Sequence, residues 1–373
     1  MKRIQTLFIA LTVAAFATAG LLLPSEAVAK PYYEGKTITV VVGLGPSSGG
    51  STLARLLGKH MSQHIEGNPK VIIKNMPGGA LLKAHNFVHA KAPKDGTVIY
   101  YGPRQPLGEL IGMPGMNFKY LDFTVLGGVQ VADLVNYARV DTLKGGLKNG
   151  ADLVKAPLVK FGGISPRTIR VLASIIQLDM LGVKFRMVPG YRGSGKLRAA
   201  VQNSEVHMGN DAAHAYLNRV VPTMVKNSMV IPVWQIPSMN AAGQLVKSPL
   251  LPGMPSFSDV YRQVKGKAPS GIKWEGIKHL VKFGQSVQHM YFGPPGMNKD
   301  AAAAFRKAFV PAMSSAAYKA DALKTVKYVP APADHKRARE VLSANKKTPP
   351  EVVKFLSDYV AKHSKPKKKK MKK

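Results

Sequence analysis

The stretch from residue 37 to residue 75 restricts the fold most, because strand and helix patterns alternate within it. "TITVVVG" at 37–43 is a continuous apolar run, which is typical of a strand buried on both faces of a parallel sheet. Apolar residues then recur at helical spacing from Leu53 to Ile65, and "KVIIKN" at 70–75 is a second strand. This order predicts a β-α-β unit and an α/β fold with parallel strands.

A second alternation follows in the middle of the chain, where "LVKFGG" leads through "ISPRT" into the helical pattern "IRVLASIIQLDML". The 373 residues also exceed what one hydrophobic core usually serves. We therefore expect two α/β lobes, each with a mostly parallel sheet, joined by two crossing strands with a cleft between them. Residues 30–130 and 237–362 are predicted to form the first lobe, and residues 131–236 the second.

The termini have compositions of their own. Residues 1–29 have a basic start, a long apolar run and a small-x-small ending at Ala27-Val28-Ala29, which predicts a cleaved signal peptide and a periplasmic protein. The alternative is an uncleaved membrane anchor, because the apolar run is just long enough to span a bilayer. Residues 363–373 are rich in lysine and predict a disordered basic tail.

The formal net charge of +34 limits the partners. Such a charge usually indicates nucleic acid, but export argues against that partner. Small organic anions, anionic lipid and acidic proteins then remain as candidates. The chain has no cysteine, so it has neither disulfides nor a thiol for lipid attachment.

The glycine-rich loop "GLGPSSGG" precedes the first helix and predicts an anion site. The first N–H groups of a helix have no acceptor within the helix, and the helix dipole places partial positive charge there. The predicted contacts are the backbone amides from Ser48 to Thr52 and nearby hydroxyls, that is, Ser47, Ser48, Gly49, Gly50, Ser51 and Thr52. The alternative is an ordinary helix cap that binds nothing. "FGGISPRT" repeats the arrangement, so two helix starts are expected to face each other across the cleft.

Other site patterns are incomplete. Gly43, Gly45 and Gly49 miss the dinucleotide-binding spacing by one residue, and "GYRGSGKL" lacks the Ser or Thr that binds magnesium in a phosphate-binding loop. Two H-x-x-x-H pairs, at 60–64 and 85–89, have no catalytic Glu between the histidines. We therefore predict no cofactor, no metal and no enzymatic activity.

An ordered set of motifs resembles the solute-binding proteins of tripartite tricarboxylate transporters, the Bug-type receptors. The motifs are "GPSSGGSTLARLLGKHMSQHIEGNPKVIIKNMPGGA", "APKDGTVI", "GYRGSGKLRAAVQNSEV", "LPGMPSFSDVY", "FGPPGMNKDAAAAFRKAF" and "TPPEVV". The resemblance implies a type II periplasmic binding protein, or Venus flytrap, that closes on a carboxylate and delivers it to membrane permease subunits. It also implies ligand contacts in a second loop at Gly162, Gly163, Ile164 and Ser165, beside which Arg167 is a candidate carboxylate partner. Ser51 stands where the family usually has an aspartate, which makes the pocket more favourable to anions.

The sequence thus predicts a monomeric, non-enzymatic receptor for a small di- or tricarboxylate. Two alternatives stay open, a basic exported protein that binds anionic lipid or an acidic partner, and a ligand sensor that feeds a signalling protein.

Overall fold

The computed structural model describes residues 30–130, 133–236, 238–239, 244–285 and 287–364. Within these residues, most strands belong to two large sheets. The chain divides into the units Met1–Pro31 and Tyr32–Lys373, and both sheets belong to the second unit. The predicted signal peptide and the part of the predicted tail beyond residue 364 lie outside the described residues, so both stay predictions.

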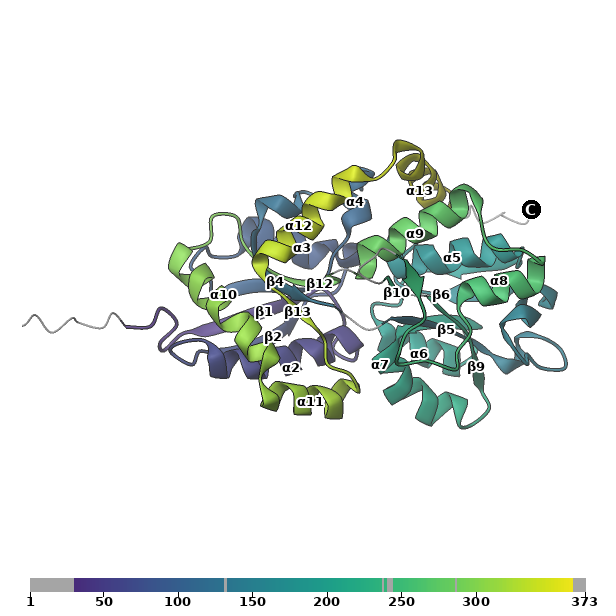
Figure 1. The fold of residues 1–373 in the computed structure, drawn as a ribbon, viewed down its shortest axis with the longest axis horizontal. Helices are drawn as coiled ribbons and strands as arrows, with labels where there is room; N and C mark the ends of the chain where they lie inside the picture. The colour runs from purple at the N-terminus through teal and green to yellow at the C-terminus, as the bar shows by residue number, and fades with distance from the viewer. Residues whose placement is uncertain (1–29, 131–132, 237, 240–243, 286, 365–373) are drawn as a thin grey trace, which may run out of the picture. The chain divides into compact units, whose positions relative to one another are not determined.

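The first sheet has six strands in the order β13-β4-β12-β3-β1-β2 (Figure 1). β1 pairs in parallel with β2 and β3, which confirms the predicted β-α-β unit. β12 pairs antiparallel with β3 and β4, and β13 pairs antiparallel with β4. The strands are β1 (Thr37–Val42), β2 (Lys70–Asn75), β3 (Val98–Pro103), β4 (Thr124–Val129), β12 (His289–Gly293) and β13 (Pro332–Ala333).

The second sheet has five strands in the order β7-β6-β8-β5-β9. β6 pairs in parallel with β7 and β8, whereas β5 pairs antiparallel with β8 and β9. The strands are β5 (Leu134–Arg139), β6 (Val159–Gly162), β7 (Phe185–Val188), β8 (Met208–Ala212) and β9 (Val230–Ile236). Separately, β10 (Ser238–Met239) pairs antiparallel with β11 (Leu245–Val246).

Strand β1 shows why its sheet is covered on both faces. Its side chains alternate, so Val40 packs in one hydrophobic cluster with Leu57 of α2, and Val41 packs in another with Val88 of α3. α2 also packs against α10 and α11, while α12 joins α3 on the other face (Figure 1). The helices near this sheet are α2 (Gly49–His64), α3 (Leu82–Lys91), α4 (Pro106–Leu110), α10 (Lys299–Ser314), α11 (Ala316–Val326) and α12 (His335–Ala344).

The helices of the five-stranded sheet come from a wider range of sequence than its strands. The helices near it are α5 (Ile169–Leu181), α6 (Ser194–Gln202), α7 (Ala213–Ala215), a π-helix at Tyr216–Val225, α8 (Phe257–Lys265), α9 (Gly271–Gln285) and α13 (Pro350–Ser364). α8 and α9 pack on α5, and α13 packs on α9. The predicted boundaries assign these three helices to the first lobe, whereas α8 and α9 pack on α5, which lies within the range predicted for the second lobe.

Short 3-10 turns complete the secondary structure, at Gly79–Leu81, Tyr120–Asp122, Val140–Thr142, Gly150–Lys155 and Asn345–Lys347. Within the residues that the structure describes, no helix has the length and apolar character needed to cross a bilayer.

Candidate functional site

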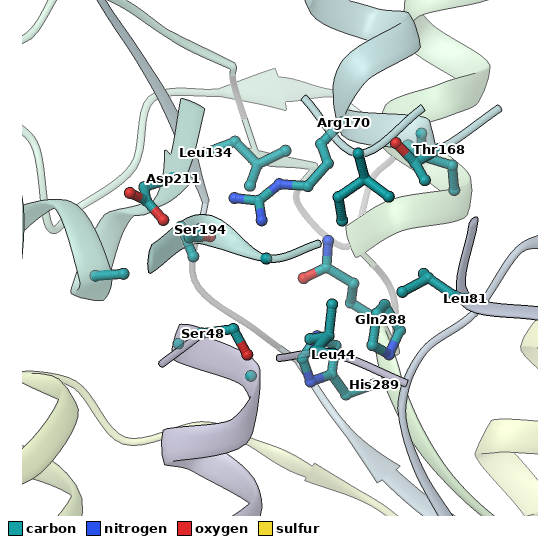
Figure 2. A pocket seen from close by; sticks show the side chains of 18 of the residues that line it. Leu44, Ser48, Leu81, Leu134, Thr168, Arg170, Ser194, Asp211, Gln288 and His289 are labelled. Atoms are coloured by element: carbon teal, nitrogen blue, oxygen red, sulfur yellow. The ribbon is translucent and has the colours of Figure 1, made fainter. Parts of the chain in front are cut away.

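A cavity of about 70 Å³ lies where α2, α5 and α6 begin, beside the carboxyl ends of strands from both sheets (Figure 2). One water molecule needs roughly 10–15 Å³ of such volume, so the cavity suits a small organic molecule. Open α/β sheets bind their ligands at this place. Its lining includes Leu44, Ser48, Gly49, Gly50, Leu81, Arg104, Gln288 and His289 from the six-stranded side, and Leu134, Ile164, Thr168, Arg170, Gly193, Ser194, Asp211 and His214 from the other.

The first turn of α2 supplies backbone donors to this cavity. Ser48 is the N-cap residue, and its Oγ accepts the N–H of Ser51 at 3.1 Å. The N–H of Ser48 is bonded within the loop, and that of Thr52 donates to Ser48 O at 3.0 Å. Among the described residues, the N–H groups of Gly49 and Gly50 have no comparable acceptor. Of the five predicted amide donors, these two are therefore available to a ligand, at the positive end of the helix dipole.

Ser51 lies behind the loop and not on the cavity. Its side chain is fully buried, accepts a hydrogen bond from Asn75 Nδ2 at 2.7 Å and donates one to Gly45 O at 2.9 Å. These bonds fix the path of the glycine loop. The position where the resemblance implies an aspartate is thus a support for the loop.

Arg170 is the strongest anion-binding group of the cavity. It stands in the first turn of α5, and Figure 2 shows its guanidinium extending into the cavity. Its Nε and Nη2 atoms are buried and have no hydrogen-bond acceptor within the described part of the chain. These two nitrogens form one edge of the guanidinium, which matches the two oxygens of a carboxylate. Burial lowers the pKa of Arg170 below its usual range, but arginine stays protonated at neutral pH.

A buried chain of polar side chains fixes the backbone of Arg170. Ser174 Oγ donates to Asn136 Oδ1 of β5 at 2.8 Å, and Asn210 Nδ2 of β8 donates to Ser174 Oγ at 3.0 Å. Asn210 Nδ2 also reaches Arg170 O at 3.2 Å. Because Asn210 precedes Asp211 on β8, the same contacts set the position of Arg170 relative to that carboxylate.

Asp211 faces the cavity from β8 and is fully buried. Its Oδ2 accepts from Arg198 Nη1 at 3.0 Å, and Tyr137 Oη lies 3.4 Å from the same oxygen. The other oxygen, Oδ1, has no donor among the residues described. A buried carboxylate with one oxygen left unpaired is costly, so Oδ1 is a second group that a ligand can satisfy.

The remaining titratable groups of the cavity leave it positively charged. Arg104 Nε and Nη2 donate to Val287 O and Phe283 O at 2.9 and 2.7 Å. Burial lowers the pKa of Arg104 to about 10, so it stays charged at neutral pH. Burial also lowers the pKa of His214 to about 4 and that of His289 to about 3, so both are neutral at pH 7.

The loops of the two sheets touch beside the cavity. Arg198 Nη2 of α6 donates to Ser47 O at 3.1 Å. Gly195 of α6 packs directly on Ser47, so closely that a Cβ at Gly195 would overlap its side chain. A ligand in this cavity would therefore contact residues from both sheets.

The predicted site residues fall into five groups. Ser48, Gly49, Gly50 and Ile164 line the cavity, whereas Ser47 and Thr52 line a small neighbouring hollow with Arg198. Ser51 is buried behind the loop. Gly162 and Gly163 lie in the packing under the second loop, where an added Cβ would come within 2.6 Å of Leu197 and 2.5 Å of Val171. Ser165 and Arg167 line a separate, larger cavity of about 1060 Å³.

The histidine pairs have structural contacts. His60 Nε2 lies 3.0 Å from Asp321 Oδ2, and the ring of His85 packs 3.9 Å from that of Tyr100.

Sequence reasoning missed Arg170, Asp211, His214 and His289. The segment "MGNDA" carries no local signal for Asp211, because its adjacent polar residues Asn210 and Asp211 do not form the apolar run of a buried strand. Arg170 is three residues beyond Arg167, but only Arg170 lies within α5, and the start of that helix at Ile169 decides which of the two faces the cavity.

Comparison with known proteins identifies the fold. No protein-family model and no curated protein sequence matches the chain. Among solved structures, the periplasmic binding protein BugD superposes with a TM-score of 0.66 at 15% identity, over 88% of this chain and 98% of its own. The chain has the fold of the periplasmic binding protein BugD.

Two further structures have the same fold. MatC (Rpa3494) from Rhodopseudomonas palustris, with bound malate, gives a TM-score of 0.61 at 18% identity, over 87% of this chain and 99% of its own. Rpa4515 from R. palustris, with adipate, gives 0.63 at 17% identity, over 88% and 97%. The predicted α/β binding-protein fold, and the resemblance to Bug-type proteins on which it rested, are thereby confirmed at the level of the fold.

Proposed function

We propose that the protein is an exported receptor that captures a small organic di- or tricarboxylate and delivers it to a membrane permease of the tripartite tricarboxylate type. The observation that carries the proposal is Arg170, whose Nε and Nη2 are buried at the cavity and have no acceptor among the described residues. A buried cation of this kind is unfavourable unless an anion pairs with it. A carboxylate supplies two acceptor oxygens in the required geometry.

The cavity favours more than one negative charge. Arg104, Arg170 and the nearby Arg198 carry positive charges, and Asp211 is the acid beside them. A second carboxylate would offset the remaining charge. MatC was solved with malate and Rpa4515 with adipate, both of which are small dicarboxylates, and these relatives by fold support the same ligand class.

Binding would stabilise the arrangement in which the two sheets approach each other. The Gly49 and Gly50 amides belong to the six-stranded side and Arg170 to the other, so a ligand held by both favours closure. The resemblance to transport receptors implies that the closed form is the one a permease recognises. We propose that residues 1–29 are removed on export, and the intact mass of the periplasmic protein tests whether it begins near Lys30.

Two measurements test the receptor function. Native mass spectrometry of protein purified without denaturation should show a bound small acid, and calorimetric titration of ligand-free protein with mono-, di- and tricarboxylates should identify a tight one. A protein that binds no member of the panel contradicts the proposal.

The net charge of +34 favours a second candidate, a protein that binds anionic surfaces. Surface attraction is screened by salt, whereas a buried ion pair is screened much less. Binding to vesicles with anionic lipid that is lost at about 0.5 M salt, with no carboxylate binding, would support this candidate. Carboxylate affinity that persists at about the same salt, where the Debye length is only a few Å, would support the receptor.

A further inference from the structure

The unpaired oxygen of Asp211 carries information about the ligand beyond its carboxylates. Asp211 is fully buried, and its Oδ1 faces no donor within the described part of the chain, while Oδ2 is held by Arg198 at 3.0 Å. Figure 2 shows the Asp211 carboxylate and the Arg170 guanidinium turned toward the same space from β8 and α5. The cavity therefore presents a buried acceptor opposite a buried double donor.

Resting on the proposed function, we infer that the ligand is a hydroxylated di- or tricarboxylate, with a carboxylate on Arg170 and its hydroxyl donating to Asp211 Oδ1. A plain dicarboxylate has no donor at neutral pH and would leave Oδ1 unpaired. An additional carboxylate at this place would be repelled by Asp211. A hydroxyl satisfies Oδ1 without adding charge.

An ammonium group is the other donor that a small acid can carry, and the charge of the cavity argues against it. Arg104 and Arg170 line the cavity, Arg198 is bonded to Asp211 beside it, and Asp211 is the acid of the lining, so these four side chains leave an excess of two positive charges; Glu109 of α4 interacts with Arg104 but does not line the cavity. Two carboxylates balance this excess when the donor is neutral. An ammonium would leave one positive charge unbalanced in a buried site, which is unfavourable.

The test compares ligands that differ in one substituent. The protein is titrated by calorimetry with ligands on three carbon skeletons, each carrying hydrogen, hydroxyl or fluorine at the same carbon. The hydrogen and hydroxyl members are succinate and malate, glutarate and 2-hydroxyglutarate, and tricarballylate and citrate. On the skeleton that fits, the hydroxyl ligand should bind at least about tenfold tighter than the hydrogen ligand, since a hydrogen bond to a charged acceptor is among the stronger ones. The fluorine ligand should bind more weakly than either, because fluorine has the size of a hydroxyl but cannot donate.

Each other outcome overturns the inference in a distinguishable way. Equal affinity for hydrogen and hydroxyl ligands means that Asp211 does not select the ligand, while the receptor function stands. Tighter binding of aspartate or glutamate than of the hydroxy acids assigns the donor to an ammonium. Failure of every acid to bind overturns both the inference and the receptor function.

An Asp211→Asn variant assigns the preference to this side chain. Arg198 should keep the amide oxygen of the new Asn at the Oδ2 position, so its NH₂ group would face the cavity as a donor. The preference for hydroxyl over fluorine should then fall to about twofold or less. Tyr137→Phe is the matched control, because Tyr137 approaches Oδ2 and does not line the cavity, and it should keep the preference. A preference that survives in a folded Asp211→Asn variant overturns the assignment, and if the variant does not fold, the ligand series still decides.

Discussion

Replacing Arg170 by methionine should weaken ligand binding strongly without weakening the ligand-free fold. Methionine keeps an unbranched apolar stem and removes the guanidinium with its two unpaired donors, Nε and Nη2. Hydrogen bonds to charged groups contribute about 1.5–3 kcal/mol each, so the loss of two costs about 3–6 kcal/mol. The dissociation constant should therefore rise about 10²- to 10⁴-fold.

The same change should have the opposite effect on the ligand-free protein. A buried guanidinium whose Nε and Nη2 lack acceptors is costly, so its replacement by an apolar side chain should leave the free energy of unfolding unchanged or raise it, although Arg170 also attracts Asp211. Asp211 keeps a cationic partner in the variant, because Arg198 holds its Oδ2 at 3.0 Å. Urea unfolding without ligand measures this effect, and calorimetry measures binding.

Arg167→Met is the matched control, three residues earlier in the turn before α5. Arg167 lines the separate large cavity, so this variant should change affinity by less than about twofold. Wild-type affinity in Arg170→Met, or a larger loss in Arg167→Met than in Arg170→Met, would refute the reasoning.

Three further substitutions and a change of pH probe the same site. Gly49→Val should abolish measurable binding in a folded protein, because a Cβ there would lie 2.6 Å from His214 Nε2; calorimetry with an unchanged affinity would show that the loop is only a helix cap. Ser48→Ala should lower the free energy of unfolding by about 1 kcal/mol through the lost helix cap, and it should alter ligand affinity only a few-fold. A loss of affinity as large as that of Gly49→Val would contradict the view that backbone amides bind the ligand. Ser51→Asp should weaken dicarboxylate binding by placing a buried negative charge behind the glycine loop, and titration with unchanged affinity would count against the electrostatic argument. The free energy of unfolding should fall as the pH drops from about 6.5 toward 4, because histidines of the unfolded chain bind protons in this range, whereas burial lowers the pKa of His214 to about 4 and that of His289 to about 3 in the folded protein. Urea unfolding should show a smaller pH dependence in a His214→Gln/His289→Gln variant. An unchanged pH dependence would disprove this origin.

The parts of the fold that could be predicted from the sequence are those set by local pattern. "TITVVVG" and the helix after it form β1 and α2 as expected, because the apolar spacing is contained in the segment itself. The place of β12 was not predictable in this way. It lies between β3 and β4, and its pairing of Tyr291 with Tyr101 joins residues far apart in the chain.

The candidate site divides in the same manner. Ser48, Gly49 and Gly50 were identifiable because a helix start is a local feature. Arg170 and Asp211 were not, because their role depends on how α5 packs beside β8. Hydrogen bonds from Asn210 to Ser174 Oγ and Arg170 O connect the two elements, and no short motif contains these contacts. The glycines of the second loop were predicted as ligand contacts, but the structure packs Leu197 and Val171 against them.

A crystal structure of the protein with its tightest-binding carboxylate tests the central claim most directly. We predict one carboxylate group within hydrogen-bond distance of Arg170 Nε and Nη2, with the amides of Gly49 or Gly50 on the same ligand. A ligand bound instead beside Arg167 in the large cavity, with Arg170 still unpaired, would contradict it.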